Sequence, residues 1–293
     1  MSVVREMIAA GPGCALANGM LNGLETTKVK MQLHNHSSPV YHNLTTRGVM
    51  QQIIREEGIV NGLLKPGLSA SLARSMLYGA YRVGLYSTAR DYLASSGEAP
   101  RLSHRIFSGM FTGGLGAMLT CPLDVIRTRM QADAGVIKRG VYQTGLRKGF
   151  AVRYGTLSST FLAILREEGL RSGLYRGASV TIARASLLNG AQLASYDSLK
   201  HVVEMPEGPL LHIMCAFSSG VIAQTVVMPI DTIKSSLMIG KCRTGIVEAV
   251  MKNGGAKWFY RGYLPACAGQ GLIMVLQMPL IEQFRKMLGA QPI

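Results

Sequence analysis

The sequence is poor in charged residues. Asp, Glu, Lys and Arg make up 16% of its 293 residues and hydrophobic residues 48%. A soluble domain usually carries about 25% charged residues, so this balance favours a membrane protein. The chain also lacks a clean run of the ~20 apolar residues that a simple spanning helix needs. Its apolar stretches are interrupted by Gly, Ser, Gln and single Arg residues. This pattern suits a helix bundle around a wet cavity, because polar groups inside a membrane normally face the interior.

Acidic residues are especially scarce. The chain has 16 of them against 31 Lys and Arg, a formal net charge of +15. Nucleic-acid binding is one explanation for such basicity. The chain has no basic patch interleaved with aromatic residues, no zinc-ligand spacing and no recognition-helix pattern. Anionic lipid and an anionic substrate explain the charge as well, and we expect no nucleic-acid partner.

Signals of enzymes and of secretion are also missing. The chain has no nucleophile elbow, P-loop or dinucleotide fingerprint, and its six histidines are scattered. We therefore expect no enzymatic activity, no metal and no catalytic cofactor. The five cysteines form no CxxC pair and are predicted to be reduced packing residues. The amino terminus has no basic segment before a long apolar core, so we expect no cleaved signal peptide.

What the chain does contain is an acid-then-base signature in three copies. The clearest copy covers residues 122–131 and reads PLDVIRTRMQ, a second covers 229–236 and reads PIDTIKSS, and a weaker copy covers 23–32 and reads GLETTKVKMQ. In each copy the acid lies two residues after the first position and the base five residues after it. Each copy ends a long apolar stretch rich in Gly and Ala. Charges at one depth of three equivalent units predict three helices that meet at one ring.

The remainder of each unit repeats as well. Steps of 110 and 85 residues superpose the second halves, which gives three repeats over residues 1–98, 99–205 and 206–293. The predicted helices span residues 4–33, 45–56 and 68–95 in the first repeat, 103–131, 156–167 and 178–203 in the second, and 208–238, 243–252 and 263–288 in the third. The linkers 34–46 and 135–153 are polar and are predicted to be surface loops. Gly109 and Gly113 are spaced as GxxxG, which lets membrane helices approach closely.

The three signatures closely resemble those of the mitochondrial carrier family, and the resemblance covers essentially the whole chain. It implies an all-α membrane protein of six transmembrane helices, arranged as three pseudo-symmetric repeats with short matrix-side helices. It also implies a multi-pass, monomeric arrangement in the mitochondrial inner membrane and the exchange of small, usually anionic, metabolites by alternating access.

The resemblance implies a gate on the matrix side, in which the acid of one repeat pairs with the base of another. Carried over to this sequence, the pairs are Glu25 with Arg127, Asp124 with Lys234, and Asp231 with Lys28. Gln32 and Gln131 stand where the family braces these pairs. The alternative interpretation, helix caps or solvated faces, does not explain three copies in register.

A second gate is implied on the cytoplasmic side. Its residues in this sequence are Arg90, Asp197, Lys200, Glu282 and Arg285, with Asp197 paired to Arg285 and Glu282 to Arg90. Ser87 stands where the third acid belongs, which would leave Lys200 without its partner and weaken this gate.

Arginines at equivalent positions mark the predicted cavity. Arg74 and Arg184 lie 110 residues apart, and the third equivalent is Gly269. An arginine inside the membrane marks a substrate path by default, and its planar fork suits a carboxylate or phosphate. The alternative is an interhelical or lipid-snorkelling role. The predicted substrate-binding residues are Arg74, Arg82, Arg184, Gln192 and Gln277.

The stretch 184–196, with residues 74–86, resembles the oxoglutarate, dicarboxylate and uncoupling-protein-like branch of the family. The resemblance implies a dicarboxylate or oxo-acid substrate. Gly269 departs from it, because that branch usually has a third arginine there.

Two turn motifs resemble the cardiolipin sites of the family. They contain Arg176 with Gly177 and Arg261 with Gly262, each just before a long helix. A helix N-terminus with free backbone N–H groups can hold a lipid phosphate. The alternative is a plain loop turn, and Pro66 interrupts the first copy of the motif.

Three function classes remain open at the level of the sequence. The first is a solute antiporter for organic anions, the second is an uncoupling-type leak carrier for protons or anions, and the third is a degenerate carrier with an interaction role. The complete matrix-side signature favours a working transporter over the third class.

Overall fold

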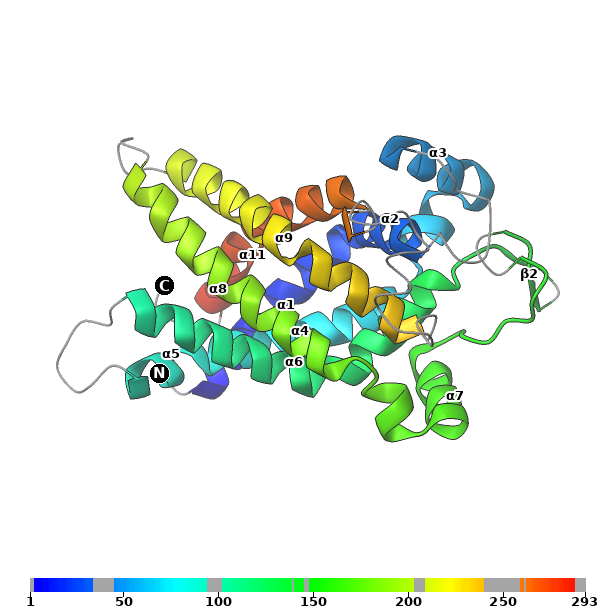
Figure 1. Ribbon diagram of the computed structural model, residues 1–293, viewed down its shortest axis with the longest axis horizontal. Coiled ribbons are helices and arrows are strands. Elements are labelled where there is room, and N and C mark those ends of the chain that lie inside the picture. Colours follow the sequence, from blue (N-terminus) through cyan, green and yellow to red (C-terminus); the bar gives the residue numbers. More distant parts are fainter. Residues whose placement is uncertain are drawn as a thin grey trace.

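Long helices lie side by side in the computed structural model of the protein (Figure 1). The structure describes residues 3–33, 45–93, 102–138, 140–144, 148–202, 209–239, 259–260 and 262–287. Within these residues the helices are α1 (Val3–Met20), α2 (Asn22–Leu33), α3 (Thr46–Glu57), α4 (Leu68–Gly84), α5 (Tyr86–Leu93), α6 (Leu102–Ala132), α7 (Leu157–Glu168), α8 (Ala178–Val202), α9 (Pro209–Ile239) and α11 (Tyr263–Met287). The all-α prediction is confirmed. The predicted helix over 243–252 falls outside the described residues.

Two of the predicted long helices are broken. The helix expected over 4–33 turns at Leu21, and the one expected over 68–95 turns at Leu85. At the first break, the side-chain amide of Asn22 donates to the carbonyls of Leu64 and Pro66, at 2.7 and 3.0 Å. These bonds hold the start of α2 to the chain before α4. The second break follows Gly84, a residue that lowers helix propensity by about 1 kcal/mol.

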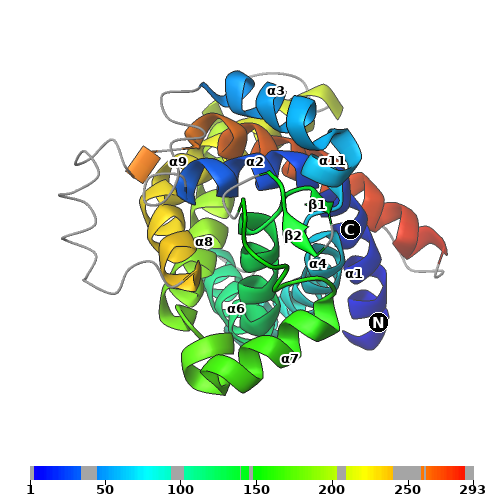
Figure 2. The ribbon, with the colours of Figure 1, turned by 90° about the vertical axis from the view of Figure 1, so that its right-hand side faces the viewer.

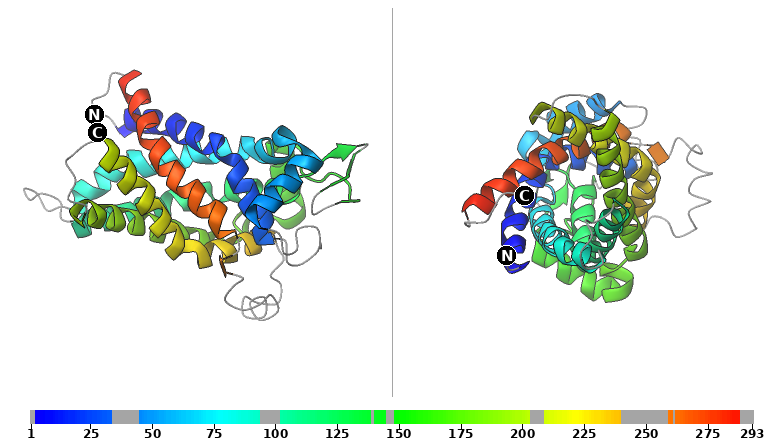
Figure 3. Two further views of the ribbon diagram at one scale, coloured as in Figure 1. Left: turned by 90° about the horizontal axis from the view of Figure 1, so that it is seen from above. Right: turned by 90° about the vertical axis from the view of Figure 1, so that its left-hand side faces the viewer.

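The long helices close into a ring. Each packs against its neighbour in the order α1, α4, α6, α8, α9, α11 and back to α1, as the view along the bundle shows (Figure 3). Glycines permit the closest approach: a Cβ on Gly113 would lie 2.0 Å from the Asn189 amide nitrogen, and one on Gly109 would lie 2.6 Å from Leu193. The GxxxG spacing therefore lies against α8, whose side chains pack directly onto the glycines.

The short elements between the long helices of the first and second repeats gather at one end of the bundle, whereas α5 lies at the other end (Figure 1). Helices α3 and α7 lie at the first of these ends (Figures 1 and 2), preceding the five-residue π-helical turns η3 (Val60–Leu64) and η4 (Leu170–Leu174). The start of α1 and the end of α11 lie at the opposite end (Figure 3). Part of the linker predicted as a loop forms a short antiparallel hairpin, β1 (Ile137–Lys138) with β2 (Val141–Tyr142). The hairpin buries Tyr142, which explains why this linker is more ordered than its polarity predicts.

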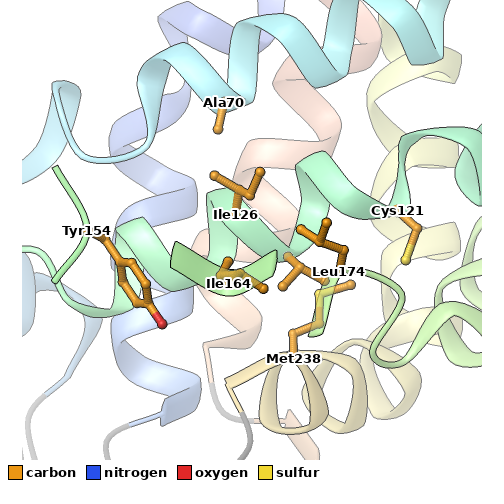
Figure 4. Packing of buried hydrophobic residues seen from close by; sticks show 8 residues of the cluster. Ala70, Cys121, Ile126, Tyr154, Ile164, Leu174 and Met238 are labelled. Carbon is orange, nitrogen blue, oxygen red and sulfur yellow. The ribbon is translucent and has the colours of Figure 1, made fainter. Parts of the chain in front are cut away.

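A compact apolar cluster fixes the end of α6 that carries the signature. Its buried side chains come from all three repeats (Figure 4): Ala70, Cys121, Val125, Ile126, Tyr154, Ile164, Leu174 and Met238. Because α7 and η4 pack on α6 through this cluster, the charged signature residues of α6 are held on the face that points into the bundle.

Three of the described helices are long and apolar enough to cross a membrane by themselves. They cover Leu102–Ala132, Ile213–Ser235 and Tyr263–Ile281, with mean hydropathy of 1.3, 1.7 and 1.5. The helices of the first repeat and α8 carry more polar residues, which is consistent with a wet interior.

Candidate transport cavity and charge ring

The three signatures meet where α2, α6 and α9 contact one another. Lys234 Nζ lies 2.8 Å from Asp124 Oδ2, Lys28 pairs with Asp231, and Arg127 pairs with Glu25. The structure thus brings together each acid with the base of another repeat that the resemblance implies. We call these six residues the signature ring.

The two predicted bracing glutamines contact neighbours of the ring acids. Gln32 accepts a hydrogen bond from Ser235 at 2.8 Å and donates to Thr232 at 3.5 Å, two residues that follow Asp231 along α9. Gln131 donates to the Asn22 side-chain oxygen at 3.2 Å. Both glutamines are almost fully buried, so these bonds tie α2 to α9 and α6 to α2 beside the ring.

A cavity of about 130 Å³ lies against the ring. Among the residues that line it are six basic side chains and three acidic ones, a formal excess of three positive charges. These residues are Lys28, Arg74, Arg82, Arg127, Arg184 and Lys234, with Glu25, Asp124 and Asp231. The low dielectric of such a site strengthens the attraction of an anion.

Arg74 and Arg184 reach from the cavity wall onto the ring. Arg74 pairs with Asp124, and Arg184 pairs with Asp231. The Arg74 guanidinium also lies over the Tyr78 ring, 5.1 Å from its centroid, in a cation–π contact. Tyr78 is oriented in turn by Asn189, whose amide donates to the phenol oxygen at 3.0 Å.

Gly269, the third equivalent position, leaves a gap in this pattern. A Cβ built on it would lie 3.9 Å from the Cβ of Leu24 and would meet nothing closer. That is ordinary van der Waals contact. Packing therefore does not require a glycine here, and a larger side chain could begin at this position.

The remaining predicted substrate residues are placed differently from one another. Arg82 and Gln277 line the cavity, and Gln277 donates to the Cys14 sulfur at 2.8 Å. Gln192 is not among the lining residues. Its side chain is buried, and neither its amide oxygen nor its amide nitrogen has a hydrogen-bond partner within the described part of the chain. Such an orphaned amide is costly unless something completes its hydrogen bonds.

The predicted cytoplasmic ring is only partly described. Asp197 lies 3.4 Å from Arg105 on α6, a partner that the sequence did not suggest. The side chains of Glu282 and Arg285 lie outside the described residues, as does that of Ser87. Arg90 and Lys200 each make an interaction, so the structure does not leave Lys200 free as the sequence suggested.

Two copies of the signature contain a second base, Lys30 or Arg129, two residues after the base that joins the ring. This second base pairs with an acid outside the ring. Lys30 Nζ lies 2.7 Å from Glu57 of α3, and both side chains are fully buried. Arg129 binds Glu168 of α7 through two parallel bonds of 2.6 Å, and it also donates to Tyr154 and to the Met238 carbonyl. These pairs fasten α3 to α2 and α7 to α6, each within its own repeat.

The two acids of these pairs lie outside the spanning helices and experience opposite effects. The hydrogen bonds from Arg129 lower the pKa of Glu168. Burial is the larger influence on Glu57 and raises its pKa, although Lys30 opposes this. The sequence did not predict these pairs, because each acid follows its base only after 27 or 39 residues. The available signal was the recurrence of a second base and an acid before glycine in both repeats.

The turns before α4, α8 and α11 share one backbone conformation. Gly67, Gly177 and Gly262 have φ of 63°, 75° and 74°, in the left-handed region that glycine adopts readily. Each lies against the signature helix of the next repeat, so the turns also repeat in threefold order: Gly67 faces the Arg127 carbonyl, Gly177 faces Leu237, and Gly262 faces the Lys28 carbonyl. Arg261 falls outside the described residues.

Comparisons with known proteins match this geometry. A family model described as mitochondrial carrier protein matches residues 1–97, 98–207 and 205–292. Mitochondrial substrate carrier family protein ucpB of Dictyostelium discoideum is 29% identical over 308 residues, covering 100% of this chain and 98% of that protein. Mitochondrial uncoupling proteins 1 and 2 of Arabidopsis thaliana are 30% and 31% identical over 280 residues, covering 90% of this chain and 86% and 87% of those proteins.

Three repeated units here form one bundle of apolar helices around a charged cavity. This is the architecture of a membrane transporter. The chain belongs to the mitochondrial carrier family. It is a mitochondrial membrane protein, and members of this family are transporters rather than enzymes.

Proposed function

We propose that the protein exchanges small organic anions, dicarboxylates or oxo acids, across the mitochondrial inner membrane by alternating access. The observation that carries the proposal is the cavity with its excess of three positive charges. At about 130 Å³ it is smaller than the ~300–1,000 Å³ typical of sites for drug-sized ligands, which favours a small metabolite.

In this proposal two arginines hold the acidic groups of the substrate. Arg74 and Arg184 lie on α4 and α8, two walls of one cavity, so each can meet a different carboxylate of the same molecule. A guanidinium binds a carboxylate through two parallel bonds, which fixes orientation as well as charge. Arg82 and Gln277, which line the cavity, then bind the rest of the solute. Gln192 does not line the cavity in this structure, but its unpartnered amide could join them when the bundle rearranges.

The signature ring acts as the gate at the end that carries α3 and α7, which we assign to the matrix side. The attraction within a buried ion pair roughly offsets the free-energy cost of taking both charges out of water. Breaking three of them and forming others at the opposite end is therefore a change between states of similar free energy. A substrate that binds the two states differently can bias it.

An uncoupling-type leak is the second candidate, and the names of the Arabidopsis relatives favour it. The two functions differ in whether transport requires a counter-substrate. We expect proteoliposomes loaded with malate or 2-oxoglutarate to take up the labelled anion at least about tenfold faster than empty ones, because an empty carrier must cross its ion-pair barrier without substrate binding energy. Equal uptake by loaded and empty vesicles, with a proton current, would favour the leak.

We also propose that cardiolipin binds at the turns of Arg176 with Gly177 and of Arg261 with Gly262. Each turn precedes the N-terminus of a 25-residue helix, α8 or α11, where backbone N–H groups face outward and favour a phosphate. The Arg176 side chain is partly exposed and 3.9 Å from Glu168, so it is available for a second anion.

Cardiolipin should raise the thermal unfolding midpoint of the detergent-solubilised protein, and Arg176→Gln should reduce that increase. The matched control is Arg171→Gln, which removes an exposed arginine of η4 five residues earlier. If both variants respond to cardiolipin as the parent does, Arg176 is not a lipid ligand.

A further inference from the structure

Two of the three ring acids are shared between the ring and the cavity. Asp124 contacts Lys234 at 2.8 Å and also pairs with Arg74. Asp231 pairs with both Lys28 and Arg184, and it accepts a further bond of 2.8 Å from Gln224. The arginines assigned to the substrate are therefore also partners of ring acids in this structure.

The sharing follows the order of the repeats. Arg74 of the first repeat reaches the acid of the second, and Arg184 of the second repeat reaches the acid of the third. The same step from the third repeat starts at Gly269, beside Leu24, and would reach Glu25. Within the described residues, Glu25 pairs only with Arg127. The ring thus consists of two doubly paired acids and one singly paired acid.

We propose that an anion opens the ring by taking Arg74 and Arg184 away from Asp124 and Asp231, and that the Glu25–Arg127 pair is not coupled to the anion. A guanidinium that binds the anion bidentately gives up donors that the ring acid used. The anion consequently binds more tightly to the state in which the acids have released the arginines, and this difference shifts the population toward the open ring. The inference rests on the proposed function, because it requires an anion in this cavity.

The labelling rate of a reporter cysteine can measure how often the signature ring opens in the absence of any substrate. Thr128 lines the cavity next to the ring, so Thr128→Cys in a background with the five native cysteines replaced should react slowly with a membrane-impermeant thiol reagent from the α3 and α7 end. With no anion present, Arg74→Gln and Arg184→Gln should each raise the labelling rate by about tenfold, since each removes a charged hydrogen bond from a ring acid. Gly269→Ala should leave the rate unchanged.

The reciprocal change is to add the missing base. Gly269→Arg should give Glu25 a second partner and lower anion-free labelling several-fold, whereas the uncharged control Gly269→Gln should match the parent. Adding malonate or 2-oxoglutarate should raise labelling in the parent, and the Arg74→Gln/Arg184→Gln double variant should not respond.

The outcomes separate this inference from the proposed function. If the arginine variants lose anion uptake but label like the parent without anion, the arginines are ligands only, and the inference fails while the proposed function stands. If uptake persists in both variants, Arg74 and Arg184 are not required ligands, and the inference fails while anion exchange stands. If the parent itself takes up no anion into loaded vesicles, the proposed function fails. If the arginine variants are not recovered in folded form, Gly269→Arg and its control Gly269→Gln provide the test. The inference is overturned if Gly269→Arg labels as fast as the parent.

Discussion

Replacing Arg184 with alanine is expected to lower uptake of a short dicarboxylate into loaded proteoliposomes by at least about 100-fold, because two charged hydrogen bonds of ~1.5–3 kcal/mol each are lost. The side chain lies in the cavity, and no other cation projects from α8 at this level. Gly269 cannot compensate from α11. The fold should persist, because Asp231 keeps Lys28 and Gln224 as partners.

Two variants calibrate this result. Arg184→Lys retains the charge without the planar fork, so uptake should fall by a smaller factor, about tenfold. Arg166→Ala removes an exposed arginine of α7 and should transport normally. Thermal unfolding midpoints distinguish lost transport from lost folding. If the folded Arg184→Ala protein takes up the dicarboxylate as the parent does, Arg184 does not bind the substrate.

The sequence predicted the helices well because their boundaries depend on local signals. Gly58 and Gly169 end α3 and α7, at positions where glycine commonly ends a helix, and the capping threonines Thr45 and Thr156 begin them. The break at Leu21 could not be predicted this way. It depends on an amide of α2 that binds carbonyls more than 40 residues away.

The ring pairs were accessible only through resemblance, since partners such as Lys28 and Asp231 are separated by 203 residues. Composition and spacing place each charge at one depth of its repeat and do not say which two charges meet. The contacts of Arg74 and Arg184 with ring acids were missed for the same reason. Arg74 and Arg184 were predicted only as substrate-binding residues, whereas a long, flexible side chain in a narrow cavity also reaches a ring acid.

Breaking the buried pair between Lys30 and Glu57 should destabilise the protein more than any change at the surface. Both side chains have no solvent exposure, and removing one partner of such a pair typically costs about 3–5 kcal/mol because the other charge stays buried. We therefore expect Lys30→Met to lower the free energy of unfolding in detergent by this amount. The direction is consistent with Glu57, whose pKa is raised by burial even in the presence of Lys30.

The double variant Lys30→Met/Glu57→Leu should recover most of that loss, because an apolar pair of similar volume carries no desolvation cost. The control Arg55→Met changes an exposed charge two residues before Glu57 and should have an effect near zero. A double variant as unstable as Lys30→Met would show that packing around Lys30, and not the unpaired charge, determines the cost.

The third repeat already carries a version of this double change. Ser236 stands where Arg129 lies in the second repeat, and Asn253, 85 residues after Glu168, stands where the acid belongs. Both charges are absent together, as expected if a lone one is too costly to bury. Ser236→Arg alone should accordingly destabilise the protein, and adding Asn253→Glu should reverse the loss. The free energies of unfolding of Ser236→Arg/Asn253→Glu and Lys30→Met/Glu57→Leu can then be compared. Both double variants should be more stable than their single variants if each base needs its acid in every repeat.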